Sequence, residues 1–359
     1  MAQNRIFYAI QALGIEAAPT DTAWPEGTGA ITWMKGVQSV GITTNFNLEQ
    51  VFELGQLAIF ENIENVPEIE VTAEKVIDGN PLLYLTSCPS GTQNIVAASN
   101  QTASVYLAIY PDTETSASGT NQVGFIWCSG MRPSNVAYTF PVEGNSTESV
   151  TFVGNDKLWV PPVGSITNIG GVGVAGNANY PSLAATTSYH GPQGFAANSA
   201  SGTVFRRQHF SNATGIATAY APAYNGTYLP TDVTVAVGAG KVQNLSVTAD
   251  IGRENIFELG RYRPYTKYAT FPIATTCEIE VVSLSGDRVS ASGDGKNLID
   301  QPIQLYFDNG QRTLKIDLGK RNKLTSVNYT GGDTGGGNAT TTYSYQGFNY
   351  FVVQTGVKS

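Results

Sequence analysis

The sequence predicts a mainly β protein made of two copies of one domain, each a β-sandwich or barrel with short helices, joined by a long polar insert. The composition is the first reason. The 359 residues include 39 Gly and 18 Tyr, with many Thr, Ser and Asn, a balance that favours strands and turns over helices. An internal repeat and strand-like alternation are the other two. A chain of this length can form two domains, each with its own hydrophobic core.

The repeat organises the chain. Residues 37–55 read VQSVGITTNFNLEQVFELG and return at 242–260 as VQNLSVTADIGRENIFELG, with eight of 19 positions identical. EIEV at 68–71 returns at 278–281, and NSTESVTFVG at 145–154 is answered by NATTTYSYQG at 338–347. Between these segments, Gly130, Arg132, Val136 and Tyr138 are answered by Gly319, Arg321, Val327 and Tyr329. Because the order is kept throughout, we interpret the pattern as a domain duplication.

These matches set the expected boundaries. We expect a first domain over residues 31–160 and a second over 236–359, with an N-terminal segment, 1–30, that packs on a neighbouring molecule. Residues 161–235 between the domains are rich in Gly, Ala, Asn and Tyr. An insert of that length inside a folded protein is usually functional or a linker.

Local patterns within the repeats indicate strands. EIEV alternates acid and aliphatic residues, as a half-buried strand does, and NATTTYSY is rich in β-branched and aromatic residues. Asp78-Gly79 and Gly331-Gly332 indicate turns. Short helical pieces are expected only within GNPLLYLTS (79–87) and GKNLIDQ (295–301).

No residue constellation predicts catalysis, a cofactor or a metal site. The glycine spacing at 171, 173 and 176 lacks the acid that a dinucleotide site needs about 20 residues later, and it is interpreted as a loop. His190 and His209 both lie in the polar insert, and the three cysteines (Cys88, Cys128 and Cys277) are widely spaced, so buried, reduced thiols are expected. We also expect no secretion signal in the N-terminal FYAIQALGI and no membrane span.

Charge is distributed unevenly between the two predicted domains. The chain has a net charge of −8; residues 31–160 contain four bases and 13 acids, whereas 236–359 contain 13 bases and 11 acids. A net negative chain is unsuited to gripping nucleic acid through its phosphates. The asymmetry suggests head-to-tail contacts between unlike domains around a ring. The candidate bases for these contacts are Arg253, Arg261, Arg263 and Lys267.

Three segments carry a family resemblance. RIFYAIQALGI near the start, VGITTNFNLEQVFELGQLAIFENIENVPEIEV, and FELGRYRPYTKYATFPIATTCEIEV resemble the tail tube proteins of tailed bacteriophages. The resemblance implies β domains whose strands combine into a barrel around a channel, with six domains in a ring and rings stacked into a tube. Two domains per chain then imply a pseudo-hexameric trimer, or otherwise a hexamer. The implied partners are copies of itself and other tail proteins, with DNA only in transit and no membrane. The implied location is the virion tail, after assembly in the bacterial cytoplasm.

The resemblance also implies roles for particular residues. Lumens in this family tend to be acidic, and the candidate lining residues are Glu61, Glu64, Glu68 and Glu70. The two FELG segments are expected to be structural or to contact a neighbouring subunit. In each, Phe and Leu would share a strand face toward the core, Gly would allow the following turn, and Glu would line the channel or bond to a neighbour. Their residues are Phe52, Glu53, Leu54 and Gly55, and Phe257, Glu258, Leu259 and Gly260.

Other functions remain open at this point. A tail terminator, baseplate hub or neck protein could use the same domain. The polar insert favours a capsid decoration or host-binding protein. A glycan-cleaving enzyme is disfavoured, because no pair of carboxylates is singled out by its spacing.

Overall fold

The computed structural model describes residues 11–17, 31–55, 57, 59–78, 81–88, 94–109, 124–160, 204–210, 242–283, 300, 302–332 and 337–357. Strands dominate these residues, and all strand pairs are antiparallel. The mainly β fold class predicted from the sequence is therefore confirmed. The helical elements are α1 (Leu83–Ser87), α2 (Ile95–Ala98) and a 3-10 turn, Arg207–His209.

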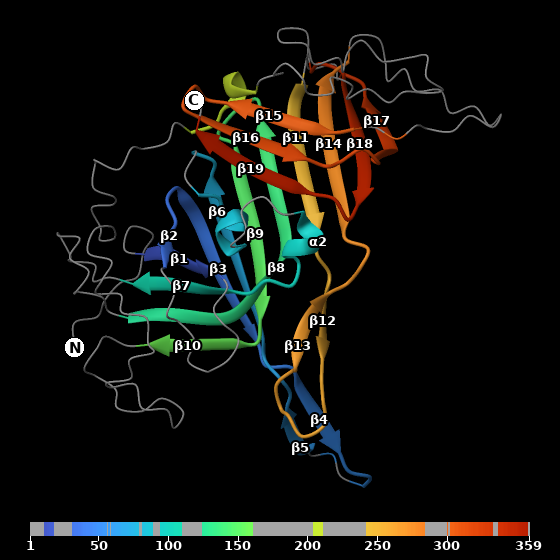
Figure 1. The fold of residues 1–359 in the computed structure, drawn as a ribbon. Coiled ribbons are helices and arrows are strands. Elements are labelled where there is room, and N and C mark those ends of the chain that lie inside the picture. The colour runs from blue at the N-terminus through green and yellow to red at the C-terminus, as the bar shows by residue number, and fades with distance from the viewer. Residues whose placement is uncertain are drawn as a thin grey trace.

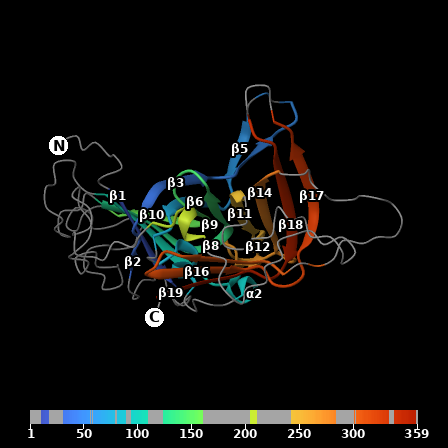
Figure 2. The same cartoon turned by 90° about the horizontal axis from the view of Figure 1, so that it is seen from above.

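One long sheet runs through the molecule (Figure 1). Its order is β3-β6-β9-β8-β11-β14-β18-β17, and β8 and β11 join the part built by residues 37–154 to the part built by 242–348. Seen from above, β3 and β17 lie at opposite ends of it (Figure 2). The strands are β3 (Val37–Asn45), β6 (Glu68–Val76), β9 (Thr147–Gly154), β8 (Gly124–Pro141), β11 (Val242–Asp250), β14 (Ala274–Val282), β18 (Thr340–Phe348) and β17 (Lys323–Thr330).

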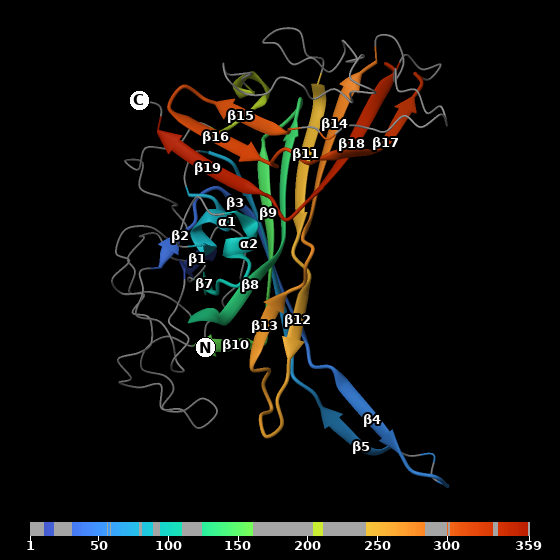
Figure 3. The same cartoon turned by 45° about the vertical axis from the view of Figure 1, so that its right-hand side comes forward.

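Two smaller sheets cover one side of this long sheet, together with α1 and α2 (Figure 3). In the first, the N-terminal part of β8 pairs with β7 (Ala103–Ile109) and β10 (Asp156–Val160), and β1 (Gln11–Ala17) and β2 (Thr32–Trp33) extend the edge. In the second, β16 (Arg312–Asp317) pairs with β15 (Gln304–Asp308) and β19 (Val352–Val357).

The hydrophobic core lies between the long sheet and these covering layers. Strand alternation places it there: in β6, Ile69, Val71 and Ala73 are buried, while Glu70 and Thr72 between them are exposed. Aromatic side chains join the layers. Phe140 of β8 stacks on Phe307 of β15, with ring centroids 3.9 Å apart.

Two β-hairpins extend from the lower end of the long sheet (Figure 3). The first hairpin consists of β4 (Leu48–Phe52) and β5 (Ile59–Glu64), and the second of β12 (Arg253–Ile256) and β13 (Thr266–Ala269). Each follows the corresponding matched strand, β3 or β11, in the chain.

The two halves have the same strand order. In the long sheet, β3-β6-β9-β8 corresponds to β11-β14-β18-β17, and in the covering layer β7-β8-β10 corresponds to β15-β16-β19. Irregularities recur at matching positions. A bulge at Val37/Ser39 corresponds to one at Val242/Asn244, and a bulge at Pro133/Asn135 to one at Leu324/Ser326. Bulges are specific local features, so two agreements of this kind exceed what a shared strand order alone requires.

The pairing revises two of the sequence matches. Arg132 pairs with Val153, and Lys323 pairs with Gln346 at the equivalent place, so Arg132 corresponds to Lys323 rather than to Arg321.

The EIEV match is the second. Thr43 pairs with Glu70, and Thr248, its counterpart 205 residues later, pairs with Thr276. Position 70 therefore corresponds to position 276, at an offset of 206. The two EIEV segments, aligned at an offset of 210, occupy different places: one begins β6 and the other lies inside β14. An alternating acid–aliphatic pattern repeats every two residues, so a slip of four leaves it unchanged.

Other expectations can be placed on the fold. The helix expected within 79–87 is present as α1, whereas nearly all of 295–301 lies outside the described residues. In the N-terminal segment, residues 11–17 form β1, which pairs with β7 of the same chain. Of the predicted insert, only 204–210 is described, and Phe205 from it is buried in the core.

Candidate functional site

The side of the long sheet opposite the core carries a continuous polar surface, called here the polar face. Strand register fixes it, because directly paired residues point to the same side. One row runs across six strands through Glu74, Ser149, Ala137, Thr248, Thr276 and Gln346. A second row contains Thr147, Thr139, Ser246, Glu278, Ser344 and Ser326. Ser, Thr and acidic residues dominate the face.

Its charge is predominantly negative. Among the described residues of the long sheet, the acids on this face are Glu68, Glu70, Glu74, Asp250, Glu278 and Glu280, and the bases are Arg132 and Lys323. Lys323 lies 3.7 Å from Asp300. The second half therefore contributes acids to the face although its overall charge is positive.

The predicted lining residues separate into two groups. Glu68 and Glu70 lie on the polar face, in β6. Glu61 and Glu64 are exposed on β5 of the first hairpin, outside the long sheet. The sequence prediction omitted Asp250, Glu278 and Glu280. A signal was available: Glu278 and Glu280 alternate with buried Ile279 and Val281, the same pattern that placed Glu68 and Glu70.

The second hairpin is bound to the first half of the chain. Arg253 donates from Nε to the Pro133 carbonyl oxygen at 3.0 Å, and its guanidinium also donates to the Ser99 carbonyl oxygen. Arg263 forms an ion pair of 2.9 Å with Asp156. The Tyr262 hydroxyl donates to the Asn65 carbonyl oxygen at 2.8 Å.

Lys267 and Arg261 complete the set of predicted contact bases. Lys267 is buried, and its Nζ lies 3.9 Å from Oε1 of Glu68 in the first half. Arg261 pairs with Glu258 of its own hairpin at 3.0 Å. Three of the four bases thus contact the first half, and these contacts lie within one chain.

Burial alters the ionisation of this contact. The pKa of the Arg253 guanidinium falls to about 10, first because of burial and then because of the nearby Arg132 charge. Burial likewise lowers the pKa of Lys267, with the Glu68 carboxylate acting in the opposite direction. Burial raises the pKa of Asp156 although the Arg263 guanidinium opposes that shift. Buried charges of this kind lower the stability of the folded protein unless they are paired.

The FELG segments lie at the hairpin tips, which corrects the expectation that Phe and Leu face the core. Phe52 and Phe257 are more than half exposed, and Leu54 and Leu259 are fully exposed. The glycines behave as expected: Gly55 and Gly260 have φ of +92° and +90°, in the left-handed region that favours glycine in turns. A Phe-x-Leu spacing indicates a shared strand face, but it does not indicate whether the protein covers that face.

The first hairpin exposes many large apolar side chains beside its four glutamates, Glu49, Glu53, Glu61 and Glu64. Its large exposed side chains are Leu48, Phe52, Leu54, Leu57, Ile59, Phe60 and Ile63. Soluble monomers rarely expose large contiguous apolar patches, which usually indicate interaction sites. The second hairpin has Arg253, Tyr262, Arg263 and Lys267 in the corresponding region, so the two hairpins differ in chemistry.

Buried polar groups inside the first half stabilise its fold. The Glu148 carboxylate accepts hydrogen bonds from the backbone N–H groups of Leu83 and Tyr84, at 2.7 and 3.1 Å, and from the Tyr138 hydroxyl at 2.8 Å. It therefore holds the start of α1 against the long sheet. Lys75 and Asp78 form a second buried pair, 2.8 Å apart.

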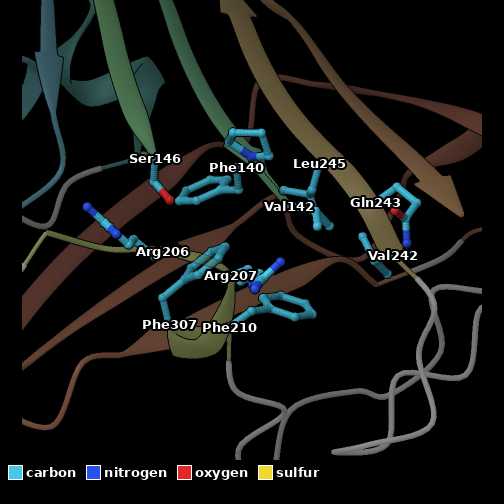
Figure 4. Close-up of a pocket in the computed structure, with 11 residues that line it drawn as sticks. Phe140, Val142, Ser146, Arg206, Arg207, Phe210, Val242, Gln243, Leu245 and Phe307 are labelled. Carbon is cyan, nitrogen blue, oxygen red and sulfur yellow. The ribbon is translucent and has the colours of Figure 1, made fainter. Parts of the chain in front are cut away.

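A small cleft lies at the upper end of the β8–β11 junction (Figure 4). Phe140, Phe210, Phe307 and Leu245 line it, with Arg206 and Arg207 at its rim. Ser146 is its only hydroxyl side chain among the described lining residues. His209 next to it accepts a hydrogen bond at Nδ1 from the Arg206 N–H, as part of the cap of the 3-10 turn. This places His209 in a structural role.

The described part of the chain contains no group of three or more His, Cys, Asp or Glu residues placed to hold a metal ion. None of the helices described there is long and apolar enough to cross a membrane. Cys88, Cys128 and Cys277 are buried free thiols.

Comparison with known proteins gives one structural neighbour to report. No family model matches the chain, and no curated protein matches it. A chain from the 6-fold symmetrised cryo-EM structure of the anti-feeding prophage (AFP) baseplate aligns over 45% of this chain and 98% of its own, with 10% sequence identity and a TM-score of 0.32. That likeness is too weak to assign a shared fold.

Proposed function

We propose that this protein is a non-enzymatic structural component of a phage tail, in which copies of the chain close into a ring and the polar face lines a channel for DNA. The observation that carries the proposal is the β8–β11 pairing. Within one chain, it joins two four-strand units of the same order into a continuous sheet. The common strand order and the matching bulges support an origin by domain duplication.

The free edges of the sheet supply the closing contact. Among the described strands, β3 pairs only with β6, and β17 pairs only with β18. In the repeat, β17 corresponds to β8 and β3 corresponds to β11. Pairing of β17 with β3 of the next copy would therefore reproduce the β8–β11 junction. Long unpaired edges are otherwise liabilities that proteins shield, and a closed barrel removes them.

Strand spacing favours three copies. Each chain contributes eight strands to the long sheet, so a trimer closes a barrel of 24. At about 4.8 Å between strands, the circumference is roughly 115 Å and the diameter about 37 Å before tilt is included. A dimer would reach only about 25 Å by the same estimate, before side chains narrow it. The trimer is therefore the smallest closed ring whose channel is wide enough for duplex DNA.

The polar face suits transit without binding. Duplex DNA is densely negative, and proteins hold it mainly by neutralising phosphates with Lys and Arg. A lining of Ser, Thr and acidic side chains provides few such contacts. The proposal assigns Glu70, Glu74, Glu278 and Glu280 to the lining and places Glu61 and Glu64 at the subunit contacts of the first hairpin.

Electron microscopy of the purified full chain tests this role. Closed rings that stack into tubes with an open centre support a tail tube protein. Single discs that do not stack indicate a terminator or hub built from the same domain. Isolated, elongated particles with no central opening contradict the proposal and favour a decoration or host-binding protein.

A further inference from the structure

The second hairpin contacts the first half of its own chain. The repeat implies an equivalent contact for the first hairpin, and one chain cannot form that contact by itself. The second hairpin rests on a surface of the first half formed by Asn65, Glu68, Pro133 and Asp156, called here the first base. Among the described residues, the first hairpin has no corresponding surface before it in its own chain, because β3 is the terminal described strand of the long sheet.

Strand register identifies the corresponding surface in the second half. Offsets taken from the paired strands relate Glu68 to Ala274 and Pro133 to Leu324. The hairpin registers relate Asn65, which follows β5, to Thr270, and Phe271 is the next residue. From β9 and β18, Asn155 corresponds to Phe348. We call this set the second base. It lacks the carboxylates of the first base, and Phe271 and Phe348 on it are both about half exposed, at 51% and 53%.

The two hairpins differ, as the two bases do, in charge and in apolar surface: the first hairpin is less basic and more apolar than the second. The β4–β5 and β12–β13 registers relate Leu48 to Arg253 and Asn62 to Lys267. The same offset relates Leu57 to Tyr262 and Phe60 to Tyr265. Leu57 is fully exposed and Phe60 is 62% exposed. Three of these positions, Leu48, Leu57 and Phe60, are thus apolar where the second hairpin is basic or phenolic, and Asn62 is uncharged where the second hairpin has Lys267.

From this match we infer that the first hairpin docks on the second base of a neighbouring copy, forming an apolar contact equivalent to the polar one within each chain. The inference rests on the proposed ring, because the copy whose β17 lies beside β3 presents its second base to the first hairpin. Burial of these side chains removes apolar surface from water, which is favourable in rough proportion to the area covered.

The side chains of the two hairpins and of the two bases also determine which halves meet. A second hairpin on a second base would bring Arg253, Arg263 and Lys267 against aromatic residues and leave buried cations without acidic partners, which is costly. A first hairpin on a first base would cover Glu68 and Asp156 with Leu and Phe. Both mismatches are disfavoured, so the interfaces alternate around the ring.

Cross-linking tests the docking in the full chain. Leu57→Cys and Phe271→Cys together, treated with a short bis-maleimide, are expected to give covalent products between copies, up to three chains. The matched control is Tyr262→Cys with Asn65→Cys, which places the thiols at the equivalent contact inside one chain. It is expected to cross-link within the monomer. The native thiols are buried, so they do not compete.

The outcomes separate this inference from the ring itself. Rings observed by native mass spectrometry, together with no intermolecular product from the Leu57/Phe271 pair, overturn the docking alone. Cross-linked pairs without closed rings support the docking and contradict the ring. A chain that stays monomeric and gives no intermolecular product overturns both. In a second variant, Leu57→Asp with Phe60→Asp should reduce ring formation at least tenfold without changing the melting temperature of the monomer, because both side chains are exposed there.

Discussion

The Tyr138 hydroxyl donates a hydrogen bond of 2.8 Å to the Glu148 carboxylate, and both groups lie in the interior of the first half. Burial raises the pKa of Glu148 above its ordinary value of 4.5, although the N–H groups of Tyr84 and Leu83 and the Tyr138 hydroxyl act in the opposite direction. Because the folded state holds this proton to higher pH than the unfolded state does, folding is favoured at low pH. That contribution decreases as pH rises above about 4.5 toward the raised pKa.

Glu148→Gln removes this titration. The variant should resemble the parent most closely at low pH, because the protonated carboxyl, like the amide, presents one accepting oxygen and one donor group. Its free energy of unfolding should then vary less with pH than that of the parent chain. Urea unfolding at a series of pH values measures both curves, with the exposed Glu70→Gln as control. Parallel curves for the Glu148 variant and the parent would show that this carboxyl does not titrate differently on folding.

Arg253 and Arg263 provide a matched pair for the contact between the halves. Arg253→Ala removes a largely buried guanidinium and leaves the Pro133 and Ser99 carbonyl groups without those donors, so the cost is expected to be about 2–3 kcal/mol. Arg263→Ala removes an ion pair whose Arg side chain is 60% exposed, and the expected cost is below about 1 kcal/mol. If chemical unfolding shows equal losses of unfolding free energy for the two variants, burial does not determine the cost of removing these arginines.

Reversal of charge on the polar face should convert a passive surface into one that binds DNA. Replacement of Glu70, Glu74, Glu278 and Glu280 by Lys should produce salt-dependent binding of a duplex oligonucleotide, measured by fluorescence anisotropy. The control makes the same change in net charge on the first hairpin, at Glu49, Glu53, Glu61 and Glu64. Equal binding by the two variants would indicate that net charge, rather than the face, controls the interaction.

The edge of β3 is expected to control assembly. Ile42 is half-buried in the single chain, and by the repeat it corresponds to Val247, which is fully buried beside β8. Ile42→Lys places a charge where the next copy would pair, a device that natural edge strands use against association. Sedimentation should show monomers for this variant and rings for Val96→Lys, which changes an exposed valine on α2. Rings formed equally by both would contradict closure through β3.

The sequence predicts the strands and the turns after the two FELG segments, because these depend on local alternation and on glycine. Gly55 and Gly260 were assigned to turns from the sequence alone, and both have positive φ. The register of the paired strands and the exposure of individual side chains are harder to predict. The periodic EIEV pattern could not distinguish an offset of 206 from one of 210, and exposure of Phe52 and Leu54 depends on whether another element covers the hairpin. Glu61 and Glu64 were assigned to the lining because composition cannot separate a hairpin from a sheet.

A cryo-EM map of the purified full chain that separates neighbouring strands tests ring closure most directly. The expected result is a closed barrel of 24 strands from three copies, with β17 of each copy paired to β3 of the next. Particles in which β3 and β17 remain unpaired, or in which each pairs with a different strand of the neighbouring copy, would contradict it.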